Sequence, residues 1–330
     1  VGTGEAGPDM IRYTVYCRFC RAASLEARVI TDSPDVFLQA FARLPLQAPA
    51  CARGAFLVRP ERFALAAESA SDNAYMTSQD AVDAARAARQ HAQLARALGS
   101  DVPVTVFSGA ADTPDAIFPN NVFATTAERF IVGRMRHPVR QREAANAAVR
   151  AHFAASGREL VDLSARGDLV AELTGVLVID RARGVGFAGM SGRCDRAGVE
   201  AMHSAFGLEL TFCFDLAPGE YHTNVVMALL ASRAVILAAG GFADPAVPQA
   251  IARAYGDRVV RLDEGQKQAF AGNAITLAED RVWMSARGAA ALRSAQRDKL
   301  AAWGFAIGTV ELDEIEKAGG SLRCCVAEIF

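Results

Sequence analysis

The chain has 330 residues, of which 52% are hydrophobic and 22% charged, and its formal net charge at pH 7 is −2. This composition supplies ample apolar material for a buried core and excludes a disordered, collagen-like or coiled-coil chain. Because a nearly neutral chain lacks the basic excess that nucleic acids and anionic membranes attract, we expect a small-molecule partner, with no nucleic acid and no membrane.

Cysteine usage and hydropathy indicate the compartment. The seven cysteines are Cys17, Cys20, Cys51, Cys194, Cys213, Cys324 and Cys325. An odd count with scattered spacing, in a chain of this size, favours reduced thiols over a disulfide framework. No stretch reaches the roughly 18 consecutive apolar residues of a membrane helix, and the first residues lack the apolar core of a signal peptide. We therefore expect a cytoplasmic protein.

Residues 1–53 differ from the rest of the chain. Two prolines between residues 44 and 49 cannot continue a helix. The pair Cys17-x-x-Cys20 suggests a metal or redox site, but no second pair of ligands follows at a similar spacing. We interpret residues 1–53 as a variable N-terminal extension, leave open whether it folds with the body, and treat residues 54–330 as a single catalytic domain.

From residue 56 onward, strands and helices are predicted in a repeating order. The predicted strands are Phe56–Val58, Val102–Phe107, Phe130–Val132, Glu159–Leu163, Val176–Ile179, Gly184–Ala188, Leu208–Phe214, Asn224–Leu230, Ala234–Ala238, Val259–Leu262, Ala274–Leu277, Val282–Ser285 and Ala306–Val310. The predicted helices are Gln79–Leu98, Arg140–Ala155, Asp195–Phe206, Pro245–Tyr255 and Ala289–Trp303. A hairpin, a helix and a returning strand recur at roughly 45–55 residues, which predicts an α/β ring of ββαβ modules around a central channel.

The first place that could carry chemistry is residues 113–123. Asp115, Asn120 and Asn121 bring one carboxylate and two amides into a short stretch, and Pro114 and Pro119 restrict its backbone. The alternative interpretation is an ordinary turn rich in Pro and Asn.

The second place is His222, at the entrance of the predicted strand Asn224–Leu230. A histidine there is held by packing behind it while its ring remains reachable, as a general acid or base requires. A purely structural histidine remains the alternative.

The third place is the C-terminal segment 319–330. A Gly-Gly turn is followed by Arg323, Cys324 and Cys325. An arginine beside a cysteine favours the thiolate, which is the nucleophilic form. Adjacent strand residues point to opposite faces, so at most one of the two thiols is expected to act as a nucleophile. Simple packing of both cysteines is the alternative.

Together these places resemble the guanidino-group-modifying superfamily, which includes arginine deiminases, dimethylarginine hydrolases and amidinotransferases. The resemblance extends from about Leu57 to Phe330, and Glu172-Leu-Thr-Gly175 is similar to the segment that supplies the histidine's carboxylate partner. It implies a five-bladed α/β propeller, the pentein fold, with no cofactor and no metal. Leu173 stands where the family has glycine.

The citrulline-utilising, ureidase-like branch is the most similar. Its motifs are matched by Phe-Pro-Asn-Asn at 118–121, His-Thr-Asn at 222–224, Phe-Ala-Gly-Asn at 270–273 and Arg-Cys-x-x-Ala-Glu-Ile-Phe at 323–330. Deiminases have guanidinium-binding aspartates where this chain has Asn121 and Asn224.

The resemblance assigns the roles. Cys324 is expected to be the nucleophile, His222 the acid and base, and Glu172 the partner that orients His222 and raises its pKa. The expected substrate-binding residues are Asp115, Phe118, Asn120, Asn121, Arg140, Asn224 and Arg323. Arg136 and Arg142 are alternatives to Arg140 for the α-carboxylate.

We expect a cysteine-dependent hydrolase of a ureido or guanidino amino acid. Citrulline, converted to ornithine, CO2 and ammonia, is the first choice, because an asparagine suits a neutral ureido group where a guanidinium would require carboxylates. An arginine or methylarginine hydrolase and an amidinotransferase are alternatives, as is a propeller that only binds a protein partner. The sequence does not determine the oligomeric state, and a homo-oligomer is one alternative.

Overall fold

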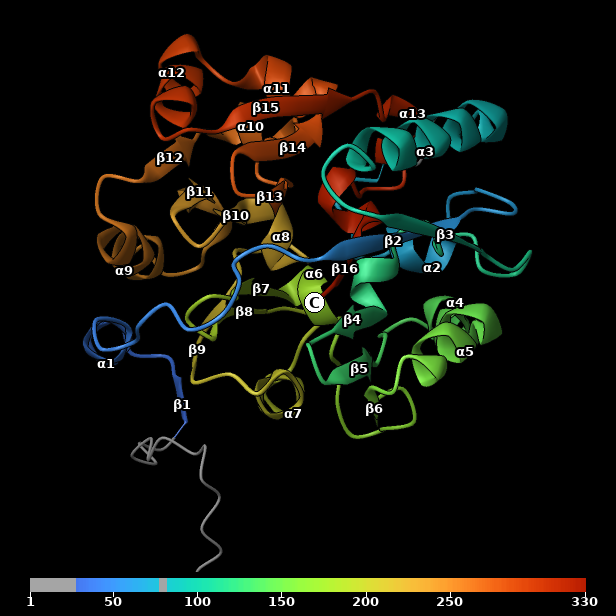
Figure 1. The fold of residues 1–330 in the computed structure, drawn as a ribbon, viewed down its shortest axis with the longest axis horizontal. Helices are drawn as coiled ribbons and strands as arrows, with labels where there is room; N and C mark the ends of the chain where they lie inside the picture. Colours follow the sequence, from blue (N-terminus) through green and yellow to red (C-terminus); the bar gives the residue numbers. More distant parts are fainter. Residues whose placement is uncertain (1–27, 77–81) are drawn as a thin grey trace, which may run out of the picture.

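The computed structural model describes residues 28–76 and 82–330, and within them the strands form five separate sheets. In four of these sheets an antiparallel pair is followed in the chain by helical structure and by a strand that pairs in parallel with the second member of that pair. In the fifth sheet the same pairing is present, but one strand of the antiparallel pair comes from the C-terminal end of the chain. The predicted ββαβ order is therefore confirmed in four sheets. Figure 1 shows the long helices on the outside and the sheets nearer the middle.

The elements of the five modules are as follows in chain order. The strands are β2 (Gly54–Arg59), β3 (Val104–Ser108), β4 (Phe123–Thr125), β5 (Arg129–Val132), β6 (Glu159–Asp162), β7 (Leu177–Asp180), β8 (Val185–Met190), β9 (Leu210–Asp215), β10 (Met227–Leu230), β11 (Ala234–Ala238), β12 (Val259–Leu262), β13 (Ile275–Ala278), β14 (Arg281–Ser285), β15 (Ala306–Val310) and β16 (Ala327–Ile329). The helices between them are α3 (Ala84–Leu98), α4 (Pro138–Gln141), η2 (Arg142–Ala145), α5 (Ala147–Ala155), α7 (Arg196–Phe206), α9 (Ala246–Tyr255), α11 (Ala286–Ala291) and α12 (Ser294–Ala302).

Three predicted elements differ from the structure. The segment predicted as strand Asn224–Leu230 begins with the helical turn α8 (Thr223–Val226), and only its second half is β10. The helix predicted over Arg140–Ala155 is interrupted at Asn146, whose side chain accepts the amide of Val149 and so starts α5 anew. The helix predicted over Ala289–Trp303 is likewise divided into α11 and α12.

Part of the N-terminal extension belongs to the fold. Strand β1 (Val29–Thr31) pairs in parallel with β9, and helix α1 (Pro34–Phe41) follows it. The Phe37 ring is fully buried and stacks on the ring of Phe212, with centroids 4.5 Å apart. Strand β1 therefore lies against β9, and helix α1 packs on both β9 and α9. Cys17 and Cys20 lie outside the described residues.

The C-terminal strand completes the first module. β16 pairs antiparallel with β2, so Ala327 lies opposite Phe56 although the two are far apart in sequence. The remaining helical elements are α2 (Ala67–Ala70), η1 (Pro119–Asn121), α6 (Leu173–Val176), η3 (Ala239–Gly241), α10 (Glu264–Gln268), α13 (Asp313–Glu316) and η4 (Leu322–Cys325).

A five-residue segment immediately precedes the first strand of every module. These segments are 118–122 (FPNNV), 172–176 (ELTGV), 222–226 (HTNVV), 270–274 (FAGNA) and 322–326 (LRCCV), ahead of β4, β7, β10, β13 and β16. We call them the inner segments. Contacts join η1 to α6, α6 to α8, and η4 to η1, so the inner segments meet near the middle of the molecule. This internal repeat positions the site.

Candidate active site

Hydrogen bonds link each inner segment to its neighbour. The Thr174 hydroxyl donates to the carbonyl of Asn120 over 3.0 Å, and the Asn224 amide donates to the carbonyl of Thr174 over 3.1 Å. The Asn273 amide donates in turn to the carbonyl of Asn224 over 2.9 Å. Its oxygen accepts the main-chain N–H of Arg323 at 2.9 Å. The donors Thr174 and Asn224 are third in their segments and Asn273 is fourth, and together these bonds fix the relative placement of the segments.

His222 and Glu172 are the first residues of two neighbouring inner segments. Nε2 of His222 lies 2.8 Å from Oε2 of Glu172, and both side chains are buried. Leu173, which follows Glu172, has φ +27°, in the left-handed region that favours glycine. The backbone therefore keeps the conformation that a glycine would adopt easily, and Glu172 reaches the histidine as the resemblance implied.

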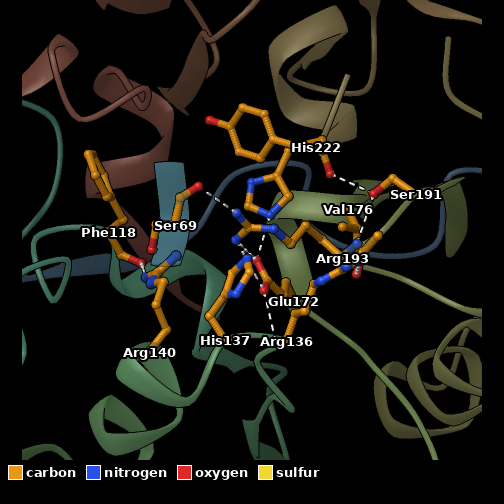
Figure 2. Close-up of polar contacts among 12 residues, drawn as sticks. Ser69, Phe118, Arg136, His137, Arg140, Glu172, Val176, Ser191, Arg193 and His222 are labelled. Carbon is orange, nitrogen blue, oxygen red and sulfur yellow. Dashed lines mark hydrogen bonds and ion pairs between the residues drawn. The ribbon is translucent and has the colours of Figure 1, made fainter. Parts of the chain in front are cut away.

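A guanidinium holds Glu172 in its charged form. Nη1 of Arg193 lies 3.3 Å from Oε2 of Glu172, and the main-chain N–H of Arg136 donates to Oε1 over 3.1 Å. Burial alone would raise the pKa of this carboxyl, but Arg193 and the bond to His222 outweigh it and hold the pKa well below its usual range. Figure 2 shows His222, Arg193 and Glu172 converging.

The Glu172 carboxylate acts on the pKa of His222 in the expected direction, but it does not determine the net shift. Burial lowers the pKa of His222 and outweighs the opposite effect of the Glu172 carboxylate, so the pKa lies below its ordinary value of 6.5. The imidazole is therefore neutral at pH 7. Its Nδ1 atom is buried and has no hydrogen-bond partner in the described part of the chain.

Cys324 lies in η4, where its thiol is buried. The sulfur is 3.3 Å from Nδ2 of Asn273 and 3.7 Å from Oδ1 of Asn224. Burial raises the pKa of the thiol, although the Asn273 amide and the Arg323 charge act in the opposite direction. Arg323 thus acts in the expected direction, but burial is the larger effect.

Arg323 itself is directed away from the thiol. Its Nη1 donates to the carbonyl of Val326 at 2.7 Å, and its Nη2 pairs with Glu328 at 2.9 Å. Cys325, the alternative nucleophile, packs in the apolar core, and burial raises its pKa well above the ordinary value. Of these three residues, only Cys324 lines the cavity described next, and Arg323 does not reach it.

A small cavity of about 20 Å3 lies beside the Cys324 thiol. Its lining residues are Ser69, Asn73, Asp115, Phe118, Asn121, Arg140, Arg193, Tyr221, Ala318, Gly320 and Cys324. Four expected substrate-binding residues, Asp115, Phe118, Asn121 and Arg140, are among them. Asn120 and Asn224 are not, and their main-chain carbonyls serve the bonds between inner segments. A cavity of this size holds about one water molecule.

Asp115 is the pocket's carboxylate. Its Oδ2 accepts the Ser69 hydroxyl over 2.6 Å, while its Oδ1 is buried without a partner among the residues described. Burial raises the pKa of Asp115, against the opposite effect of the Arg140 charge. An unsatisfied buried carboxylate oxygen is costly, so this atom is suited to accept a donor from a ligand.

Asn121 lies close to His222. Both approach Gly175: a Cβ atom at residue 175 would lie 2.7 Å from Oδ1 of Asn121 and 2.8 Å from Cε1 of His222. The Oδ1 atom of Asn121 is buried and, like Oδ1 of Asp115, lacks a partner within residues 28–76 and 82–330. Two unpartnered acceptors therefore belong to the walls of one pocket.

Two of the three guanidinium nitrogens of Arg140 already donate hydrogen bonds to other residues of the protein. Its Nε and Nη2 atoms each lie 2.9 Å from the Glu143 carboxylate, and Nη2 also donates to the carbonyl of Phe118 over 3.2 Å. Only Nη1 remains for a ligand. Of the two alternatives, Arg136 is exposed near the pocket mouth, and Arg142 lines a different surface pocket. The assignment of an α-carboxylate partner stays a prediction.

Several site residues were not predicted. Arg193 forms two bonds to Asp72, of 3.2 Å and 2.5 Å, besides its contact with Glu172. Ser69, within α2, and Asn73, shortly after it, both reach the pocket. Asn273 contacts the Cys324 thiol. Only Asn273 gave a usable signal, since it ends the Phe-Ala-Gly-Asn motif.

Two further properties concern cofactors and membranes. In residues 28–76 and 82–330, no three His, Cys, Asp or Glu side chains gather in a way that could bind a metal ion. Over the same residues, no helix combines the length and the hydropathy needed to cross a membrane.

Solved structures of similar fold come from enzymes of arginine chemistry. The N-terminal domain of ArgZ, an arginine dihydrolase from the ornithine-ammonia cycle in cyanobacteria, is 20% identical with a TM-score of 0.73, and the match covers 84% of this chain and 97% of that domain. Against full-length ArgZ the TM-score is 0.74, and 40% of that chain is covered. A dimethylarginine dimethylaminohydrolase carrying an S-methyl-L-thiocitrulline adduct is 19% identical, with a TM-score of 0.65 and coverage of 84% and 100%.

These likenesses establish the fold. No curated protein matches the chain. The family model described as N,N dimethylarginine dimethylhydrolase, eukaryotic, matches residues 59–330. Since that match covers most of the sequence, the chain belongs to the N,N-dimethylarginine dimethylhydrolase family, within the guanidino-group-modifying superfamily that its motifs resemble.

Proposed function

We propose that this protein is a cysteine-dependent hydrolase that cleaves a C–N bond in the guanidino group of arginine or an N-methylated arginine. The observation that carries the proposal is the unpartnered, buried carboxylate oxygen of Asp115 in the pocket beside Cys324. The solved relatives named for arginine and dimethylarginine chemistry support the same substrate class.

The charges around the pocket favour a cationic substrate. Of the three buried acidic groups around the pocket, Glu172 is held in its charged form, whereas burial raises the pKa of Asp115 and of Glu143, and two buried guanidinium groups, those of Arg140 and Arg193, lie near them. A substrate guanidinium would bring a cation to Asp115, and all of its N–H groups are donors. It therefore complements the two unpartnered acceptors on Asp115 and Asn121. The expected first choice, citrulline, brings no charge and fewer donors, so the earlier alternative is the better supported one.

The first half of the proposed reaction is displacement at the guanidinium carbon. Neutral His222 takes the proton of the Cys324 thiol at Nδ1, and the sulfur attacks the carbon. His222 then returns the proton to the departing nitrogen. Ammonia or a methylamine leaves, and a thiouronium group remains covalently bound to Cys324.

The second half is hydrolysis. His222 removes a proton from water, which adds to the thiouronium carbon, and the C–S bond breaks with return of the thiol. The ureido product retains the oxygen from water. Throughout, the Glu172 carboxylate orients the imidazole and stabilises its charged form as each proton arrives.

The overall arrangement is also part of the proposal. We infer that the five modules close into a five-bladed propeller with the inner segments around its axis. Membership of the ureidase-like branch, and assembly into a homo-oligomer, remain predictions.

A substrate panel tests the function. We expect purified protein to release ammonia or a methylamine from L-arginine or its N-methylated forms, with a covalent adduct on Cys324 detectable by mass analysis. C324S abolishes turnover, and C325S retains most of it. Turnover that requires an added amine acceptor would indicate an amidinotransferase, while absence of both turnover and adduct would favour a protein that only binds partners.

A ureido substrate remains a second candidate because Asn121 provides an amide in the pocket. An Asn N–H could stabilise charge on a ureido oxygen as it develops. D115N separates the two candidates. For a guanidinium substrate, loss of the Asp115 charge lowers kcat/KM by about 10²-fold, or roughly 3 kcal/mol for a buried charged pair, whereas for citrulline the change is small.

A further inference from the structure

Four of the five inner segments already contribute a side chain to the proposed chemistry, namely Asn121, Glu172, His222 and Cys324. The remaining segment, 270–274, contributes Asn273. We propose that Asn273 is a positioning residue for the nucleophile, because its side chain fixes the turn that carries Cys324 and donates a hydrogen bond to the Cys324 thiolate. This inference rests on the proposed role of Cys324.

The oxygen of Asn273 holds the nucleophile turn. Oδ1 accepts the main-chain N–H of Arg323 at 2.9 Å and that of Cys324 at 3.4 Å. Main-chain N–H groups are always donors, so they determine which amide atom faces the turn. The orientation of the Asn273 amide is therefore set by the backbone and leaves Nδ2 on the other side.

The nitrogen of Asn273 faces the thiol. Nδ2 donates to the carbonyl of Asn224 at 2.9 Å and lies 3.3 Å from Sγ of Cys324. Asn273 and Cys324 are both buried, so bulk solvent does not reach this contact. A hydrogen bond to the charged form favours ionisation. The neutral thiol, in turn, has Oδ1 of Asn224 at 3.7 Å as an acceptor.

The turn that holds Asn273 is itself tightly fixed. Phe270 has φ +60°, which is strained for a residue with a side chain, and its carbonyl accepts the N–H of Asn273 at 2.9 Å. A Cβ atom at residue 272 would lie 2.4 Å from the carbonyl oxygen of Val225. This segment is thus pressed against the one that carries His222, which leaves Asn273 little freedom to move.

Two variants and a matched control test the inference in the full chain. N273A removes both functions of the amide, and N273D keeps an acceptor for the main-chain N–H groups while it replaces the donor by an oxygen. Q266A is the control. Gln266 lies in the same module, is buried and donates to the carbonyl of Ala291 and to Gln296, but it does not contact Cys324.

The readout is the titration of the Cys324 thiol without substrate. Ultraviolet absorbance of the thiolate is followed against pH, with C324S as the blank, and the rate of alkylation by iodoacetamide is followed by intact mass. We expect the titration of N273A to move to higher pH, with an alkylation rate at neutral pH about tenfold lower, since one pKa unit is a tenfold change in thiolate. N273D moves further in the same direction, because its carboxylate repels the thiolate.

The outcomes separate a positioning role from a structural one. Q266A is expected to lower thermal stability while its thiol titrates as in the wild type. Superimposable titrations of the wild type and N273D would overturn the inference, and N273D carries the test alone where N273A does not fold. Failure of the proposed function has a different signature, namely turnover that survives in C324S.

Discussion

The Nε2 atom of His222 is 2.8 Å from Oε2 of Glu172, and both side chains are fully enclosed by protein. Because the Glu172 carboxylate is ionised, it can only accept, so a neutral imidazole carries its proton on Nε2. The lone pair of His222 is therefore on Nδ1, the buried atom without a partner in the described residues. In the proposed mechanism, Nδ1 is therefore the atom of His222 that exchanges protons with Cys324 and the substrate.

Removing the Glu172 charge is expected to reduce catalysis far more than substrate binding. In E172Q the imidazolium formed during each proton transfer loses its counter-charge, so kcat falls by about 10²–10⁴-fold, the range for a placed acid and base. Steady-state kinetics with the best substrate of the panel measure this.

D180N is the matched control for E172Q. Asp180 is equally buried and pairs with Arg183 at 2.8 Å and with the Tyr255 hydroxyl at 2.7 Å, outside the site. It is expected to lower thermal stability with little effect on kcat. Equal losses of kcat in both variants would contradict a catalytic role for Glu172.

The decline of kcat/KM at acidic pH is expected to follow the protonation of His222. The free enzyme needs this imidazole neutral, and burial keeps its pKa below 6.5, so kcat/KM of the wild type declines only below that pH. The nearby charge of Arg193 also lowers the pKa. R193M removes that charge, so the decline is expected to begin at higher pH. A decline of kcat/KM that begins at lower pH in R193M than in the wild type would show that the Arg193 charge does not lower the pKa of His222.

Much of the fold and several site residues followed from local sequence. The ββαβ order is visible because hairpins, helices and returning strands each have their own hydrophobic period. Cys324 and His222 stood out because their residue types carry chemistry, whereas Glu172 was indicated only by the family resemblance of residues 172–175. The inner segments were not recognised, since Asn224–Leu230 reads as one apolar strand, and only packing against neighbouring segments turns its first residues into a helical turn.

Other features depend on contacts that sequence does not encode locally. Arg193 and Asp72 are far apart in the chain, and nothing near either residue indicates that they meet over Glu172. The net pKa shifts of His222 and Cys324 could not be predicted for the same reason, although Glu172 and Arg323 act on them in the expected directions. Neighbouring charges can be read from motifs, but the degree of burial, which dominates both shifts, is a tertiary property.

Gly175 is expected to be intolerant of a side chain. A Cβ atom there would lie 2.7 Å from Oδ1 of Asn121 and 2.9 Å from Nδ1 of His222, so G175A displaces one of these groups. Because small displacements of reacting groups cost about 10²-fold in rate, we expect a loss of that size in kcat. The control is G167A, since a Cβ at Gly167 has nothing within 4 Å. Wild-type kcat in G175A would mean that His222 is not held where the mechanism requires it.

His91 is expected to set the acid stability of the fold, independently of catalysis. It lies on α3 with its ring buried, and its Nε2 atom has no partner in the part of the chain that the structure describes. Burial, assisted by the Arg59 charge, lowers the pKa of His91 to about 4. In the unfolded chain His91 binds a proton near pH 6.5, but in the folded protein it does so only near pH 4. The free energy of unfolding is therefore unaffected by His91 above pH 6.5 and declines as the pH falls toward 4. At about 1.4 kcal/mol per pKa unit, the loss from this residue is on the order of 3 kcal/mol.

H91L removes this dependence, because leucine is neutral at every pH. Urea unfolding at pH 7 and near pH 4 should show a smaller difference in the free energy of unfolding for H91L than for the wild type, by about 3 kcal/mol. H152Q is the control, since His152 is an exposed residue of α5. An H91L protein that loses as much stability as the wild type between the two pH values would show that other groups cause the acid sensitivity.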